Sequence, residues 1–332
     1  MLGDPCQLPP TVISDSSGDG SSPLSISLMS RLASILPHPI YTSGQTDTSP
    51  KDDSFLNSKA TRQAISLLRN KMNTSKVTKS YRKQYAGAIL LSVQYRMHPS
   101  IAAFSSAIFY DSLLTTPSFL SDQRQVPSAL KTNLLLTDNN IGIRFINVGG
   151  LNNEDRDQQP GSFGTSSSNL SLKTRSFIND EEANTVIKLM KILMKGKVSS
   201  ESFSGTIGVV TPYSAQVSLI KGKIASDPEM RKLALDFPSS FEINTVDAYQ
   251  GRERDIIIFS AVRSNRNGQI GFLKDWRRLN VALTRAKCGL LIVGDFCTLT
   301  EGDPHWASLG TWCQELGCLF DDHSVVNVSG EQ

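Results

Sequence analysis

The 332-residue sequence contains little cysteine and no long apolar run. Its five cysteines form no Cys-x-x-Cys pair, and their odd number argues against a disulfide framework, so we expect reduced thiols and an intracellular protein. No apolar stretch approaches the ~18 residues of a membrane span, and the first residues lack the basic and apolar segments of a secretory signal. No contact with a membrane is therefore expected. His98 has no Glu-x-x-His partner and no cysteine pair, so no protein-held metal is expected either.

Charge is distributed unevenly along the chain. The formal net charge is +3, but residues 301–332 hold six acidic residues and no lysine or arginine, which leaves +9 for residues 1–300. Eight basic residues and no acidic ones lie between Lys59 and Lys83. This balance favours a polyanionic partner such as a nucleic acid. Residues 59–83 could contact a phosphate backbone, and the alternative is that they form only a solvated helical face followed by a basic loop.

Short apolar runs alternate with helical patterns from residue 88 onward. The runs are residues 88–93, 143–148, 207–210, 243–246, 256–262 and 290–293, and helices are expected at residues 58–73, 180–194, 215–224 and 304–320. Apolar strands buried on both faces are typical of a parallel sheet between helices, so the sequence predicts an α/β fold. A further helix is expected at residues 24–36, within the Ser/Gly/Pro-rich stretch 14–56, and a surface loop at residues 149–174.

Four phrases carry a more specific signal. They are GDPCQ at residues 3–7, QYRMHP at residues 94–99, VDAYQGRE at residues 246–253 and RRLNVALTRAK at residues 277–287. In this order they resemble superfamily 1 RNA/DNA helicases of the nonsense-mediated-decay and senataxin type, and the wording LPPTVIS at residues 8–14 leans towards senataxin. The resemblance covers roughly residues 1–14 and 88–300. It implies a RecA-like fold and an ATP-dependent 5′-3′ helicase.

One part of such a motor is missing from the sequence. Helicases of this class need a Gly-x-x-x-x-Gly-Lys-[Ser/Thr] loop to cradle the phosphates, and this sequence has neither that loop nor an acidic Mg²⁺-holding motif ahead of Gly3. We therefore expect residues 1–92 to be the end of a first RecA-like domain with a basic helical insert. Residues 93–300 would form the second RecA-like domain, and residues 301–332 a C-terminal helix with an acidic tail. ATP and Mg²⁺ would be held mainly by the missing domain, and the chain would be inactive alone.

The resemblance assigns catalytic roles to Gln7, Arg96 and Arg285. Gln7 would sense the γ-phosphate, while Arg96 and Arg285 would act as arginine fingers, because phosphoryl transfer spreads negative charge that a guanidinium stabilises. Alternatives remain for each residue. Gln7 could be a turn residue facing solvent, Arg96 a buried salt-bridge partner, and Arg285 a positive charge at a helix C-terminus.

The same resemblance places the nucleotide near Tyr95, Gln250, Gly251 and Glu253. Tyr95 would stack on the base, with core packing as its alternative. Glu253 would accept hydrogen bonds from the ribose hydroxyls, with a plain surface charge as its alternative.

Nucleic-acid contacts are expected at Thr211, Pro212, Tyr213 and Thr245, which end two of the predicted strands. Helix N-termini and hydroxyl groups bind phosphates, and such contacts carry no base information. Simple capping of the next helix by Ser214 is the alternative. A further family phrase, formed by Ser176, Asn179, Glu182 and Ala183, is interpreted as a structural cap.

The expected partners are single-stranded RNA or DNA, RNA–DNA hybrids and the missing RecA-like domain, and the nucleus is favoured over the cytoplasm. The rival hypothesis is a truncated, non-catalytic module that binds nucleic acid or another protein. The intact Arg96, Glu253 and Arg285 argue against it, because residues that serve only catalysis should drift in a relic.

Overall fold

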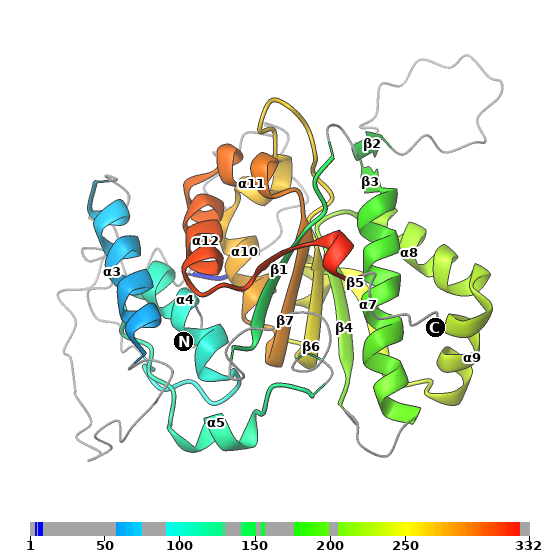
Figure 1. The fold of residues 1–332 in the computed structure, drawn as a ribbon, viewed down its shortest axis with the longest axis horizontal. Coiled ribbons are helices and arrows are strands. Elements are labelled where there is room, and N and C mark those ends of the chain that lie inside the picture. Colours follow the sequence, from blue (N-terminus) through cyan, green and yellow to red (C-terminus); the bar gives the residue numbers. More distant parts are fainter. Residues whose placement is uncertain are drawn as a thin grey trace.

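The computed structural model describes residues 4, 6–8, 58–74, 91–128, 130, 141–150, 154–156, 176–198 and 205–325. Its centre is a six-stranded parallel sheet in the order β5-β4-β6-β7-β1-β8 (Figure 1). The strands are β1 (Ile143–Asn147), β4 (Ile207–Thr211), β5 (Phe241–Thr245), β6 (Arg254–Ser260), β7 (Ala286–Gly294) and β8 (Leu319–Asp321). The predicted RecA-like α/β fold is confirmed.

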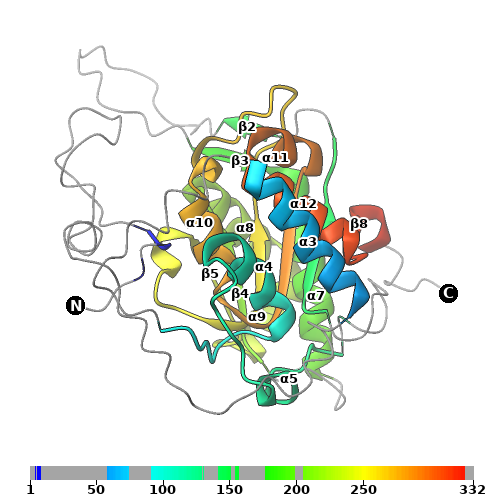
Figure 2. The same ribbon diagram turned by 90° about the vertical axis from the view of Figure 1, so that its left-hand side faces the viewer.

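Helices cover both faces of the sheet. One face carries α7 (Asp180–Val198), α8 (Ser214–Ser226) and α9 (Pro228–Asp236), and the other carries α3 (Lys59–Thr74), α4 (Pro99–Phe109), α10 (Trp276–Leu283) and α12 (Pro304–Glu315) (Figures 1 and 2). Successive side chains of a strand point to opposite faces, so the Ile, Val and Leu runs of β4, β6 and β7 feed two separate apolar cores. No helix in the described part of the chain is both long enough and apolar enough to cross a membrane.

Five of the six predicted strands are present, with ends shifted by up to four residues. The run at residues 88–93 is the exception. In its described part, Val93 forms only an isolated bridge with Thr115, and Leu91 and Val93 are 69% and 42% exposed. That prediction is wrong for residues 91–93, because the segment lies outside the sheet and buries little apolar surface. β8 and the small antiparallel pair β2 (Glu154–Arg156) and β3 (Phe177–Asn179) were not predicted.

The helices expected at residues 58–73, 180–194 and 215–224 are confirmed as α3, α7 and α8, and the one expected at 304–320 is present as α12 but ends at Glu315, because residues 319–321 form β8. Ser58 caps α3 as expected, accepting the Thr61 N–H at 3.1 Å. Ser214 does not cap α8 but begins it, and the Ala215 N–H instead donates to Ser176 Oγ at 3.0 Å. The helix expected at residues 24–36 lies outside the described residues.

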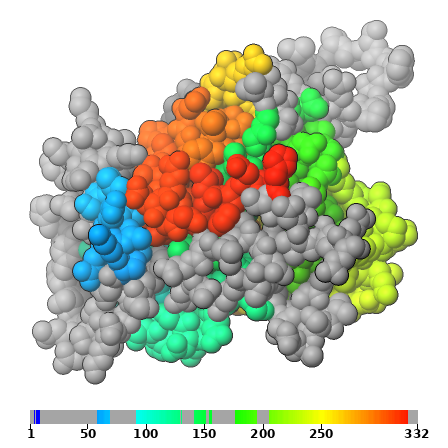
Figure 3. Space-filling view, in the orientation of Figure 1, coloured from blue at the N-terminus to red at the C-terminus, as the bar shows by residue number. Residues whose placement is uncertain are grey.

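The elements at the two ends of the chain share one core. α3 packs against α12 and α4, and Figure 3 shows α3 beside the C-terminal helices on the molecular surface. α11 (Phe296–Gly302) crosses residue 300, and β8 extends the central sheet. The division at residues 92 and 300 stays a prediction, since these contacts do not show how the segments fold separately.

A short crossover runs from the carboxyl ends of the strands back to their amino ends. Residues 246–253, which include η3 (Asp247–Tyr249), run from the carboxyl end of β5 to the amino end of β6. Tyr249 is buried against Gly208 of β4, and a Cβ at Gly208 would collide with the Tyr249 hydroxyl and with Ile257. Glycine at this position therefore makes room for the crossover.

Candidate functional site

Residues from distant parts of the sequence meet at the amino ends of the parallel strands, which we call the amino edge of the sheet. Arg254 pairs with Ala286 at the starts of β6 and β7, so the residues before them, Glu253 and Arg285, lie side by side. We refer to Gln7, Arg96, Glu253, Arg285 and Lys287 as the amino-edge cluster.

Arg96 and Glu253 form an ion pair within this cluster. Arg96 donates from Nε to Glu253 Oε2 at 2.6 Å and from Nη1 to the Thr284 carbonyl at 2.9 Å, while Lys287 Nζ lies 3.1 Å from Glu253 Oε1. Burial alone would raise the pKa of Glu253, but the hydrogen bonds from Arg96 and Lys287 outweigh it and lower the pKa. Glu253 is therefore a charged carboxylate shared by two cations. The alternative for Arg96 is right about the salt bridge but wrong about its burial, because the Arg96 and Glu253 side chains are 31% and 41% exposed.

Arg285 is buried at the C-terminal end of α10. Its Nε donates to the Val281 carbonyl at 2.9 Å, and its Nη2 donates to Thr284 Oγ1 at 3.2 Å and to Gln7 Oε1 at 3.3 Å. Burial, together with the nearby Arg96, lowers the pKa of Arg285 to about 10. The guanidinium thus satisfies one carbonyl group at the end of α10, as the alternative for Arg285 predicts, and also reaches Gln7.

Gln7 is held by contacts that the sequence did not reveal. Its Nε2 donates to Asp4 Oδ2 at 3.1 Å, and the same carboxylate accepts from Tyr110 Oη at 2.7 Å. Asn280 Nδ2 donates to the Cys6 carbonyl at 2.8 Å. Gln7 therefore does not face solvent freely. Asn280 lies inside one of the four phrases, but nothing in the sequence pointed to Tyr110.

The predicted nucleotide contacts lie around this cluster. Tyr95 is 61% exposed, which excludes core packing, and it stacks on Phe119 with ring centroids 6.4 Å apart. The turn that contains Tyr95 is fixed by Gln94, whose Oε1 accepts the N–H groups of Arg96 and Met97. Gln250 and Gly251 are exposed in the crossover, and the φ of +80° at Gly251 requires a residue without a Cβ.

The predicted nucleic-acid contacts lie at the opposite, carboxyl ends of the strands, which we call the carboxyl edge of the sheet. Thr211 and Thr245 are neighbours in register on β4 and β5. Thr211 is fully buried, and its Oγ1 has no hydrogen-bond partner among the described residues. Tyr213 is also buried, whereas Pro212 and Thr245 are half-buried. The structure therefore leaves only Pro212 and Thr245 of this set with accessible atoms.

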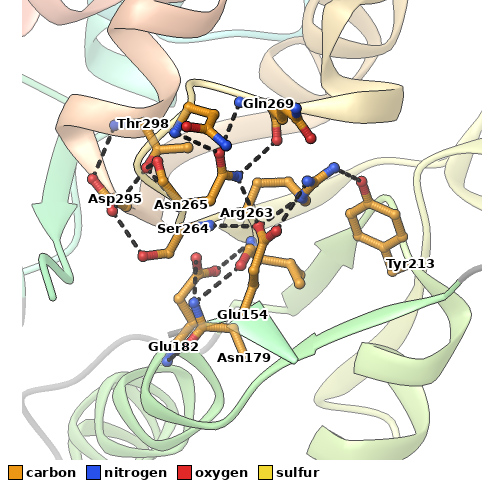
Figure 4. Close-up of polar contacts among 12 residues, drawn as sticks. Glu154, Asn179, Glu182, Tyr213, Arg263, Ser264, Asn265, Gln269, Asp295 and Thr298 are labelled. Atoms are coloured by element: carbon orange, nitrogen blue, oxygen red, sulfur yellow. Dashed lines mark hydrogen bonds and ion pairs between the residues drawn. The ribbon is translucent and has the colours of Figure 1, made fainter. Parts of the chain in front are cut away.

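A polar network lies at the carboxyl edge (Figure 4), and of its members the sequence indicated only Asn179 and Glu182, as a structural cap. We refer to Glu154, Asn179, Glu182, Arg263, Ser264, Asn265 and Asp295 as the carboxyl-edge cluster. Arg263 donates to Glu154 from Nε at 2.6 Å and from Nη2 at 3.0 Å, and it lies over the Phe177 ring at 4.2 Å. Burial lowers the pKa of Arg263, but hydrogen bonds to Glu154 and Tyr213 outweigh it and raise the pKa. Arg263 is thus a buried, paired cation.

Glu182 combines a structural and an unusual electrostatic role. As predicted, Asn179 caps α7, because its Oδ1 accepts the Glu182 N–H at 3.0 Å. The Glu182 carboxyl group, however, is fully buried and accepts from Ser260 Oγ at 2.7 Å and Val262 N at 2.8 Å. Burial raises its pKa to about 8 despite these bonds. Val262 has a φ of +72°, an uncommon conformation for a β-branched residue, so the chain is tightly constrained just before Arg263.

The side chains present fit part of a nucleotide site. Guanidinium, amide and carboxylate groups and an exposed aromatic ring suit phosphates, ribose and base. Within the described ranges, no group of three His, Cys, Asp or Glu side chains could hold a metal ion.

Comparisons with known proteins agree with this architecture. The protein family described as “AAA domain” matches residues 72–296. The chain is 37% identical over 220 residues to “Helicase sen1” of Schizosaccharomyces pombe, covering 66% of this chain and 11% of that protein. It is 35% identical over 235 residues to “ATP-dependent helicase upf1” of the same organism, covering 70% and 22% of the two chains. “Regulator of nonsense transcripts 1” of Dictyostelium discoideum is 37% identical over 223 residues, covering 66% and 14%. The chain thus spans about a fifth or less of these relatives.

Proposed function

Because the chain belongs to the Upf1-like superfamily 1 helicases, we propose that it is the second RecA-like part of an ATP-dependent 5′-3′ helicase acting on single-stranded RNA or DNA and on RNA–DNA hybrids. It would close on a nucleotide held by another RecA-like domain. Residence in the nucleus stays part of this proposal.

The observation that carries the proposal is the amino-edge cluster. Gln7, Arg96, Glu253 and Arg285 come from four separate phrases, and hydrogen bonds or an ion pair connect them in two pairs at one end of β6 and β7. Two guanidinium groups and an amide at one sheet edge form a place where phosphate charge can be neutralised.

ATP would supply the phosphoryl group whose transfer to water drives the motor, with Mg²⁺ held mainly by the other domain. On this chain, Arg96 and Arg285 would stabilise negative charge on the phosphates, and Gln7 would contact the γ-phosphate beside them. Glu253 would accept the ribose hydroxyls, and the exposed Tyr95 would stack on the base. At the opposite edge, Thr245 and the turn after β4 would hold the phosphates of one strand without reading bases.

A binding test on the chain alone separates the parts of this proposal. We expect fluorescence anisotropy to show weak, sequence-independent binding of a single-stranded RNA oligonucleotide, with affinity that falls steeply between about 50 and 200 mM salt. We expect no RNA-stimulated ATP hydrolysis, since the sequence has no Gly-x-x-x-x-Gly-Lys-[Ser/Thr] loop. Salt-independent binding, or turnover of even ~1 s⁻¹, would contradict the proposal.

A second candidate is a module that binds nucleic acid or protein without helping catalysis. One observation favours it: Arg96 is engaged by Glu253, and Arg285 by a helix carbonyl, so both arginines already have structural partners. The two candidates differ in a chimera that replaces the matched region of the fission-yeast helicase sen1 with this chain. RNA-stimulated ATP hydrolysis by the chimera supports the helicase, and its loss with intact RNA binding supports the module.

A further inference from the structure

The carboxylate of Glu154 lies in a nearly closed set of donors. Arg263 approaches it with Nε and Nη2 at 2.6 and 3.0 Å, the Ser264 N–H donates at 2.9 Å, and Asn265 Nδ2 donates at 3.1 Å. Figure 4 shows these groups converging on Glu154. A two-pronged guanidinium, a backbone N–H and a side-chain amide are donors that proteins also use to bind phosphate oxygens.

These donors are held in place without Glu154. Ser264 Oγ donates to Asp295 Oδ2 at 2.7 Å, and the Asn265 N–H donates to Thr298 Oγ1 at 3.0 Å. The Asn265 side chain also accepts the backbone N–H of Gln269 at 2.9 Å. Because Ser264 and Asn265 have anchors of their own and Arg263 also donates from Nη1 to Tyr213 Oη, the arrangement should persist when the carboxylate leaves it.

The place of this anion site in the fold points to its ligand. Arg263 comes three residues after β6, at the carboxyl edge of the sheet. Its Nη1 lies 3.4 Å from Tyr213 Oη, in the turn where nucleic-acid contacts are proposed. Glu154 itself belongs to β2, a three-residue strand that pairs only with β3, outside the main sheet.

We propose that Arg263, Ser264 and Asn265 form a binding site for a backbone phosphate of single-stranded nucleic acid, which Glu154 occupies in this structure as a carboxylate competitor. The inference rests on the proposed strand-binding edge and deepens it. The Glu154 side chain is only 12% exposed and that of Arg263 only 6%, so the phosphate can enter only when Glu154 moves out. The exchange replaces one negative charge with another, which keeps the buried Arg263 paired.

The test compares RNA affinities of the full chain and its variants by fluorescence anisotropy, with a single-stranded RNA of roughly 15 nucleotides. Glu154→Gln weakens the competitor and should tighten binding about tenfold, with a salt dependence steeper by about 0.7 in log–log slope, as expected for one more phosphate contact. Arg263→Gln should weaken binding, and adding Glu154→Gln to it should then have no effect.

Glu242→Gln is the matched control, since Glu242 is also paired with arginine, in its case Arg252 and Arg254, but lies on β5 towards the amino edge. Equal tightening by this control would reduce the effect to net charge and overturn the proposal. Unchanged affinity and slope for a folded Glu154→Gln protein would overturn it too, leaving the ion pair a structural clamp.

Crosslinking of the wild-type chain keeps the proposal testable if the variants do not fold. RNA carrying 4-thiouridine should crosslink to the segment around residues 263–265, identified by mass spectrometry. Crosslinks confined to other segments would overturn the phosphate site. If the wild-type chain binds no RNA at all, the proposed function itself fails, so the two failures are distinguishable.

Discussion

At the amino edge of the sheet, Arg96 and Lys287 contact the carboxylate of Glu253, and the buried Arg285 lies nearby. At the carboxyl edge, by contrast, Arg263 pairs with Glu154, and the buried carboxyl groups of Glu182 and Asp295 belong to the same polar network. The two ion pairs also differ in burial, since Arg96 and Glu253 are partly exposed while Arg263 and Glu154 are largely enclosed.

This contrast suggests that the two edges bind an anion in different ways. Surplus positive charge near the surface attracts phosphate directly, because it needs little desolvation. Where a buried cation is already paired with a carboxylate, as Arg263 is with Glu154, a phosphate can enter only by displacing that carboxylate. The amino edge therefore suits a mobile nucleotide, and the carboxyl edge a strand that exchanges with an internal group.

The largest expected effect tests the role of Arg285. In the sen1 chimera, Arg285→Ala should lower kcat for ATP hydrolysis by at least ~10³ with KM changed only a few-fold, because the guanidinium acts on charge that develops in the transition state. Steady-state kinetics measures this, and thermal unfolding of the variant checks folding, since Arg285 also bonds the end of α10. A change in KM alone would reduce Arg285 to a structural charge and break the contrast between the edges.

The next effect concerns the buried acid of the carboxyl edge. The folded-state pKa of Glu182 is raised from 4.5 to about 8, so between these values the native state holds a proton that the unfolded state has released. The stability contributed by the neutral carboxyl group is complete below pH 4.5 and should fall as pH rises towards 8, by on the order of a few kcal/mol.

Urea unfolding at several pH values measures this fall, and Glu182→Gln is the matched control. The amide keeps the shape of the side chain but cannot titrate, so its stability should vary less between pH 5 and 8. Parallel pH profiles for the two proteins would show that Glu182 is already ionised in the native state.

The smallest effect tests the crossover that joins the two edges. Gly208→Ala should destabilise the fold by about 1–3 kcal/mol, because the added Cβ meets the Tyr249 hydroxyl and Ile257. The Tyr249 hydroxyl has no hydrogen-bond partner in the described part of the structure, so Tyr249→Phe alone should change stability little. Combined with Gly208→Ala, it should recover part of the loss in urea unfolding. If the stability changes of Gly208→Ala and Tyr249→Phe simply add, the added Cβ does not clash with the Tyr249 hydroxyl.

The fold was largely predictable because its signals are local. The runs around Ile207, Ile256 and Leu290 are apolar on both faces, which a parallel sheet between helices requires. The strand expected at residues 88–93 failed where it is described, since an apolar composition there has no neighbouring strand to pair with beyond the single bridge at Val93.

The candidate site was predictable in part. The four phrases named Gln7, Arg96, Glu253 and Arg285, and the structure brings these residues to one edge of the sheet. The phrases could not reveal that Arg96 pairs with Glu253, nor that Thr211 is buried, because pairing and burial depend on which strands become neighbours.

By itself, then, the sequence determined the α/β class, the family and four residues of the amino edge, namely Gln7, Arg96, Glu253 and Arg285, because these depend on periodicity and on short phrases. Beyond the cap formed by Asn179 and Glu182, the tertiary structure alone decided the carboxyl-edge cluster. Glu154 and Arg263 are 109 positions apart, and no local pattern marks either residue. They meet because β2 docks beside the end of β6, and burial then makes their pairing obligatory.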